Sequence, residues 1–227
     1  MTSLVFAALF LPVSHFGISS TSLRARFVTA LGERGFQGLY SLVTVVAFAW
    51  LILAYRHAPL TILWVAPAAV TVTSLLLVSI AFVLVVVGVT TPNPTTVGAE
   101  GLFDRADAVR GILRVTRNPF LWGTGLWALA HIAATGDAAS ILFFSSIGSL
   151  GWVGAALLDH KKARQHGSRW ERFASQTSSV PFLAIAQRRQ MLAVGEIGLW
   201  RVAIAATLFV VLLMLHARLF GVSPLPR

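Results

Sequence analysis

The chain has no cysteine and few acidic residues. Its 227 residues include 8 Asp and Glu against 18 Lys and Arg, which gives a formal net charge of +10 at pH 7. Without cysteine, the chain cannot form disulfides, thiolate metal sites or a covalent haem link through a C-x-x-C-H motif. Carboxylates are also absent from the interior of every long hydrophobic stretch. This absence argues against a proton pump or ion transporter that works through buried carboxylates.

Hydrophobic residues make up 56% of the chain and are gathered into six stretches. These stretches cover residues 3–18, 37–55, 62–90, 120–135, 140–158 and 200–220. A helix needs about 20 apolar residues to cross the hydrocarbon core of a bilayer. The sequence therefore predicts an all-α protein, a polytopic membrane bundle of about six transmembrane helices with short amphipathic surface helices. We expect a single transmembrane domain over residues 1–227, with the lipid bilayer as its partner.

The basic residues alternate between the gaps that separate these stretches. All but three of the 18 Lys and Arg lie in the first, third and fifth gaps or at their edges, and the exceptions are Arg56, Arg218 and Arg227. Positive charge collects on the cytoplasmic side of membrane proteins. We therefore expect a multi-pass protein of the bacterial inner membrane with both termini on the outer, periplasmic side. The charge does not indicate nucleic-acid binding, because it lies where anionic lipid headgroups would be.

The third gap carries an organised set of charges. Asp104 is expected to cap a short helix that reaches towards Arg117. In such a helix Arg110, Arg114 and Arg117 are spaced i, i+4, i+7 and would form one basic face. That face could lie on lipid phosphates, or it could bind an anion such as a cofactor phosphate or a propionate. Asn118-Pro119 is expected to begin the fourth membrane helix, because proline is well tolerated at a helix start.

Histidine is the ionisable residue that remains within the stretches, as His15, His131 and His216. Neutral imidazole is a good ligand for haem iron, and two histidines on separate helices would suit a non-covalent haem b. Helix rise places His15 ~18 Å and His131 ~10 Å below the outer surface, an offset that helix tilt could bridge. The alternative is that each ring bonds a neighbouring helix carbonyl. His216 is expected to be a headgroup or helix-contact residue.

Several segments resemble the NnrU family, which includes the plant ζ-carotene isomerase. They are the run from His15 to Ser20, Gly32 to Phe36 with Leu39-Tyr40, Gly111 to Pro119, Leu126 to His131 with Gly136-Asp137, and the tail pieces Asp159 to Gly167 and Thr177 to Phe182. The resemblance covers nearly the whole chain. It implies that His15 and His131 are the haem b ligands. Independently of it, Arg114 and Arg117 of the basic face, with the adjacent Asn118, are further cofactor-binding candidates.

The resemblance implies two kinds of role. One is cis–trans isomerisation of a carotenoid-like polyene that enters from the lipid, and the other is a part in denitrification or nitric oxide metabolism. The chain reads Arg117-Asn118-Pro119 where relatives commonly have Arg-His-Pro, a pattern shared with membrane methyltransferases related to isoprenylcysteine carboxyl methyltransferase. Those enzymes also carry a later acidic pair that residues 159–167 lack. A methyltransferase using S-adenosylmethionine and a non-catalytic assembly factor remain the alternatives.

Overall fold

The computed structural model describes residues 1–19 and 21–225. Ser20, at the end of the opening motif, and Arg227, one of the outer basic residues, lie outside the described residues. The long helices are α1 (Thr2–Ser19), α2 (Ser22–Arg56), α3 (Ala68–Thr90), α4 (Pro119–Thr135), α5 (Ala138–His166) and α9 (Leu199–Phe220). Shorter elements are the 3₁₀ turns η1 (Glu100–Asp104) and η2 (Gly111–Arg114) and the helices α6 (Ser168–Gln176), α7 (Leu183–Ala186) and α8 (Val194–Ile197).

The six long helices correspond to the six hydrophobic stretches, which confirms the prediction of an all-α membrane bundle. Five of them are long and apolar enough to cross a membrane. The sixth, α4, has 17 residues, the lower end of the length that spans a bilayer. It packs between α3 and α5, so neighbouring helices cover two of its sides. The protein is therefore a multi-pass membrane protein.

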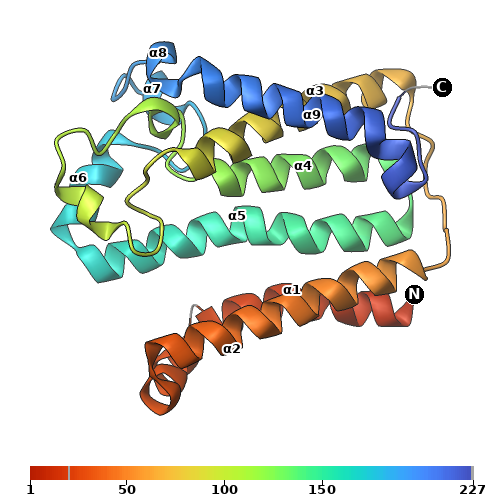
Figure 1. Ribbon diagram of the computed structural model, residues 1–227, viewed down its shortest axis with the longest axis horizontal. Coiled ribbons are helices and arrows are strands. Elements are labelled where there is room, and N and C mark those ends of the chain that lie inside the picture. The colour runs from red at the N-terminus through yellow and green to blue at the C-terminus, as the bar shows by residue number, and fades with distance from the viewer. Residues whose placement is uncertain (20, 226–227) are drawn as a thin grey trace.

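The long helices run roughly parallel, with α4 and α5 between the pair α3 and α9 and the pair α1 and α2 (Figure 1). Helix α9 packs on α3, α3 on α4, α4 on α5, α5 on α1, and α1 on α2. The start of α1 and the end of α9 lie at one end of the bundle. The short elements η1, η2, α6, α7 and α8 gather at the other end, together with the first turns of α2. The three gaps rich in basic residues therefore share one end of the protein.

Small residues let α4 and α5 approach closely. A Cβ on Gly151 would lie 2.5 Å from the Leu121 carbonyl oxygen and 2.8 Å from the Gly125 nitrogen. Real Cβ atoms do not come so near to backbone, so the two helix backbones meet only because position 151 is glycine. Gly154, one turn further along α5, has only ordinary contacts, the nearest to Phe16 at 3.8 Å.

The third stretch is shorter as a helix than its hydrophobicity predicts. Helix α3 begins at Ala68 rather than near Ile62, and Pro67 is its N-cap. Residues 62–67 run along the end of α4 instead: Leu63 and Trp64 donate backbone hydrogen bonds to the Gly136 carbonyl at 2.8 and 3.1 Å. Proline disfavours helical backbone in the residue before it, which explains why the helix does not extend upstream.

The predicted helix from Asp104 to Arg117 is wrong. Asp104 ends η1 instead of capping a helix, and η2 is a separate four-residue turn. Between them Arg110 is extended and Gly111 has a positive φ of 56°. A Cβ on Gly111 would lie 2.9 Å from the Glu196 carbonyl oxygen, so the backbone of α8 packs directly against this glycine. The three arginines therefore do not share a helix face.

Candidate functional site

His131 lies on α4, and of its two ring nitrogens only Nδ1 makes a hydrogen bond within residues 1–19 and 21–225. Its Nδ1 is 2.8 Å from the Trp127 carbonyl oxygen. A carbonyl can only accept, so Nδ1 carries the proton and Nε2 keeps its lone pair. The ring stacks on Phe144 of α5 at 4.7 Å between centroids and tilts against Trp127 at 4.6 Å. This carbonyl bond is the arrangement that orients a metal-ligating histidine.

His15 lies on α1 and is held by Tyr40 of α2. The Tyr40 hydroxyl is 2.7 Å from Nδ1 and 3.0 Å from Nε2 of His15, so it lies within hydrogen-bond distance of both ring nitrogens. The tyrosine side chain therefore ties α1 to α2 at this level. Sequence reasoning missed this partner, although Leu39-Tyr40 stood among the family motifs.

The structure does not bring His15 and His131 together. Helix α5 lies between α1 and α4, so the positions of His15 and His131 along the bundle can be compared through the α5 residues that each region contacts. His131 stacks on Phe144, whereas Phe16, beside His15, lies 3.8 Å from the Cβ position of Gly154. Ten residues separate these two points of α5, which is ~15 Å along the axis. In the described arrangement Nε2 of His131 has its lone pair available as a ligand nitrogen, while the His15 ring is hydrogen-bonded to Tyr40.

Arg114 is engaged by an acidic residue from the far end of the sequence. Its Nε and Nη2 donate to the two Glu196 carboxylate oxygens at 2.8 and 2.9 Å, and its Nη1 donates to Gln190 at 2.6 Å. Glu196 also accepts from the Gly111 N–H at 2.8 Å. Arg114 and this N–H hold the pKa of Glu196 down to about 2. The pair holds α8 against η2, and no motif or spacing in the sequence indicated Glu196 as a partner of Arg114.

Arg117 and Asn118 converge on one carboxylate, Asp159 of α5. Arg117 donates from Nε and Nη2 to Oδ2 at 2.9 and 2.7 Å. Asn118 donates from Nδ2 to Oδ1 at 2.9 Å and to the Ser179 hydroxyl at 3.1 Å. The Arg117 guanidinium also lies over the Trp170 ring at 5.1 Å. Each of the two arginines is therefore paired with a carboxylate, Arg114 with Glu196 and Arg117 with Asp159, which offsets the positive charge that would attract a propionate or phosphate.

A groove of about 590 Å³ lies between α4 and α5. Its lining residues are Trp122, Leu126 and Leu129 from α4, Trp152, Ala155, Ala156 and Asp159 from α5, and Ser179. The groove is apolar along its length and polar where Asp159 and Ser179 end it. Nine residues, about two and a half turns, separate Trp122 from His131, so the groove and the histidine lie on opposite faces of α4.

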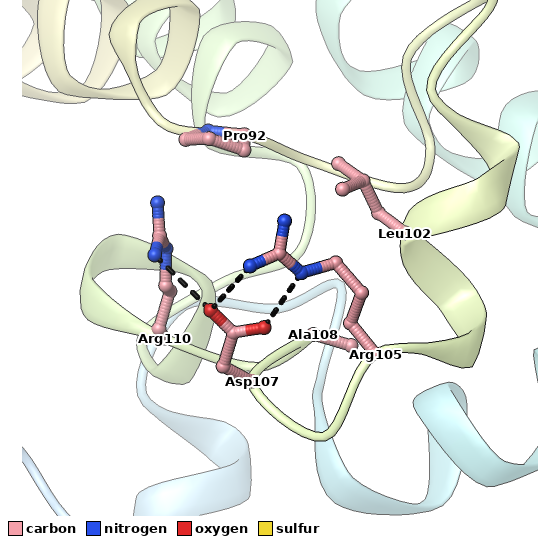
Figure 2. Close-up of a pocket in the computed structure, with 6 residues that line it drawn as sticks. All are labelled: Pro92, Leu102, Arg105, Asp107, Ala108 and Arg110. Atoms are coloured by element: carbon pink, nitrogen blue, oxygen red, sulfur yellow. Dashed lines mark hydrogen bonds and ion pairs between the residues drawn. The ribbon is translucent and has the colours of Figure 1, made fainter.

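A second, much smaller pocket lies in the third gap (Figure 2). Its volume is about 20 Å³, room for a water molecule but not for a cofactor. Asp107 lies between two cations there, and accepts from Arg105 at 2.9 Å and from Arg110 at 3.2 Å. The hydrogen bond from Arg105 is the main cause that lowers the pKa of Asp107, and the positive charge of Arg110 adds to it. Elsewhere among residues 1–19 and 21–225, no group of three or more His, Cys, Asp or Glu is placed to hold a metal ion.

Comparison with known proteins gives a family and two plant relatives. The family model described as NnrU protein matches residues 3–224. The chain is 34% identical over 84 residues to the chloroplastic 15-cis-zeta-carotene isomerase of Arabidopsis thaliana, which covers 36% of this chain and 22% of that protein. It is 33% identical over 82 residues to the Zea mays protein of the same name, with the same shares, 36% and 22%. The matched part is thus under a quarter of these relatives' length, and no solved structure matches.

Proposed function

Because the chain belongs to the NnrU family, we propose that it is a membrane protein that binds haem b through His131 and catalyses cis–trans isomerisation of a lipid-soluble polyene. The reaction class comes from the two plant relatives, whose name is that of a carotene isomerase. The observation that carries the haem ligand is the His131 ring, whose Nδ1 bond to Trp127 leaves Nε2 as a ligand nitrogen.

The surroundings of His131 favour a flat, apolar partner. Trp127 and Phe144 hold the ring from two sides, so Nε2 has a defined direction. A bound haem would supply a redox-active iron that acts on a double bond of the polyene. The protein's part is to fix the imidazole tautomer, to keep water away by placing the site within the bilayer, and to admit the polyene laterally from the lipid.

In this proposal His15 is not a haem ligand. In the described arrangement it is hydrogen-bonded to Tyr40 at a different level from His131. With His131 as its one protein ligand, a bound haem would be able to take an external ligand as well. This differs from the paired ligation that the family resemblance implies, and the two arrangements predict different spectra.

The test is an absorption spectrum of the detergent-purified protein, oxidised and reduced, for the wild type and three variants. We expect His131→Ala to lose the haem bands and His15→Ala to keep them. His57→Ala is the matched control, because His57 makes the same bond to the carbonyl four residues earlier, Leu53, at 2.7 Å but lies in an exposed turn. Loss of the haem bands in both His15→Ala and His131→Ala would contradict ligation by His131 alone and would show that both histidines are needed to hold the haem. A wild type that stays colourless after haem supplementation would refute the haem proposal.

The same preparation separates the two roles implied by the family. Conversion of a 15-cis polyene by the reduced wild type, absent in His131→Ala, is the outcome that the isomerase proposal requires. Tight nitric oxide binding to the reduced protein without any polyene conversion would instead assign the protein to nitrogen-oxide metabolism.

A further inference from the structure

Lys161, near the basic end of α5, is a partly buried cation that no carboxylate pairs. Within residues 1–19 and 21–225 its ammonium makes no hydrogen bond or ion pair, whereas the neighbouring Lys162 donates to Glu100 at 2.9 Å. Lysine is seldom buried unless its charge is paired. The arginines at this end of the described chain whose side chains also lack a partner are exposed: Arg26, Arg34, Arg164, Arg172 and Arg188.

The fold places Lys161 where α1 ends and α2 begins. Lys161 follows Gly154 by seven residues of α5, so the two lie on the same helix face, ~10 Å apart along the axis. Gly154 faces Phe16 of α1, and α1 ends three residues later at Ser19. The Lys161 side chain therefore lies just beyond the end of α1.

Arg24, in the first turn of α2, is a second cation beside Lys161. The charges of the two side chains act on each other. Arg24 donates to Glu33 at 2.5 Å, and its guanidinium lies over the Phe36 ring at 5.3 Å. These two contacts hold the guanidinium in place at the junction of α1, α2 and α5.

The charges around Lys161 do not balance. The charges that act on it are those of two cations, Arg24 and Lys162, and two carboxylates, Glu33 and Glu100. Each carboxylate already has its own cation, because Glu33 pairs with Arg24 and Glu100 with Lys162. The charge of Lys161 is therefore left over. An anion between Arg24 and Lys161 would remove the repulsion between them.

The depth of Lys161 in the membrane indicates the source of this anion. Lys161 lies 23 residues after Ala138, the first residue of α5, which is ~35 Å along the helix. That distance slightly exceeds the ~30 Å hydrocarbon core, so the ammonium reaches the level of the lipid headgroups. The headgroup phosphate is the abundant anion there. A zwitterionic headgroup would also bring a cation to a place that already has one in excess.

We propose that Arg24 and Lys161 together bind the phosphate group of an anionic phospholipid. Guanidinium and ammonium groups both donate charge-assisted hydrogen bonds to phosphate oxygens. The same chemistry would accept a free phosphate ion, so the experiment includes inorganic phosphate as a probe. The site does not involve His131, so it holds or fails independently of the haem and isomerase proposals.

The experiment is native mass spectrometry of the delipidated full-length protein in detergent. It is titrated with dioctanoyl phosphatidylglycerol, dioctanoyl phosphatidylcholine and inorganic phosphate. We expect the phosphatidylglycerol to bind about tenfold more tightly than the phosphatidylcholine, the effect of one set of charge-assisted hydrogen bonds. Inorganic phosphate should bind more weakly than either lipid, because it has no acyl chains to bury. Equal affinities for the two lipids would overturn the proposal, and inorganic phosphate that binds as tightly as phosphatidylglycerol would overturn the lipid as its source.

Four variants locate the effect. Lys161→Gln and Arg24→Gln should each lower the preference for phosphatidylglycerol to about twofold or less. Lys161→Arg keeps the charge and should keep the preference. Arg172→Gln is the matched control, because it removes the same charge from an exposed position of α6 at the same end, and it should also keep the preference. An unchanged preference in Lys161→Gln or Arg24→Gln would overturn the proposal. Equal losses in Lys161→Gln and Arg172→Gln would overturn it as well, because net charge alone would then attract the lipid.

Discussion

Arg117 and Asp159 join the start of α4 to the end of α5 through two hydrogen bonds from one guanidinium to one carboxylate oxygen, at 2.9 and 2.7 Å. Their side chains are 14% and 17% exposed. The carboxylate also receives the Asn118 amide. Arg117, Asn118 and Asp159 therefore form a polar triad that joins α4 and α5 at the end of the bundle that carries the basic residues.

Asp159→Asn is expected to destabilise the protein by about 2 kcal/mol, because it leaves a largely buried guanidinium without its counter-charge. The measurement is unfolding in mixed detergent micelles. Asp104→Asn is the control, because its ion pair with Arg169 is about half exposed, at 48% and 52%. Exposed pairs contribute less than about 1 kcal/mol. Equal losses in the two variants would contradict the structural role of the Asp159 triad.

The contact between η2 and α8 is expected to weaken in acid. Arg114 and the Gly111 N–H lower the pKa of Glu196 from its usual 4.5 to about 2. A lowered carboxyl pKa stabilises the folded contact above pH 4.5, and this stabilisation is lost as the pH falls towards 2. Hydrogen exchange of residues 187–198, corrected for intrinsic rates, should therefore quicken over this range. In Glu196→Gln, exchange should be faster at neutral pH and should lack this pH dependence; a matching pH profile in wild type and variant would contradict the assignment.

The membrane-spanning part of the fold was predictable because hydropathy is a local property of the sequence. Each of the six stretches became a helix, but two boundaries differ clearly: α3 begins at Ala68, after Pro67, and α2 begins at Ser22, well before its stretch, with a break at Gly32. The third gap was not predictable in the same way. Arg114 pairs with Glu196, 82 residues away, and Arg117 pairs with Asp159, 42 residues away. No local spacing in the sequence predicts partners at such separations.

The two histidines also differ in how much the sequence could indicate about them. The sequence could single out His131 as an ionisable group within a membrane helix, and the alternative considered for it, a bond to a nearby carbonyl, is present. In this structure that bond is also what leaves Nε2 free. The level of His15 relative to His131 depends on how α1 and α4 pack on opposite sides of α5, which is a property of the folded bundle.

Gly151→Ala is expected to cost about 2 kcal/mol in the unfolding measurement, because the added methyl would meet α4 backbone at 2.5 and 2.8 Å. The matched control is Gly154→Ala on the same helix, whose added methyl has only van der Waals contacts. It should change stability by no more than about 0.5 kcal/mol, since alanine also favours the helix. A Gly151→Ala variant as stable as Gly154→Ala would show that α4 and α5 are further apart than described.

The charge distribution predicts the orientation in the membrane, and the absence of cysteine makes this prediction directly measurable. The end of the bundle that holds η1, η2 and α6 carries most of the basic residues and is expected to face the cytoplasm. His57→Cys and Ala106→Cys place single thiols in exposed positions of opposite ends in an otherwise thiol-free chain. A membrane-impermeant maleimide should label His57→Cys in intact spheroplasts and should label Ala106→Cys only after permeabilisation. The cysteine-free wild type reports background labelling. The reverse pattern would place the basic end outside and the termini in the cytoplasm, against the positive-inside expectation.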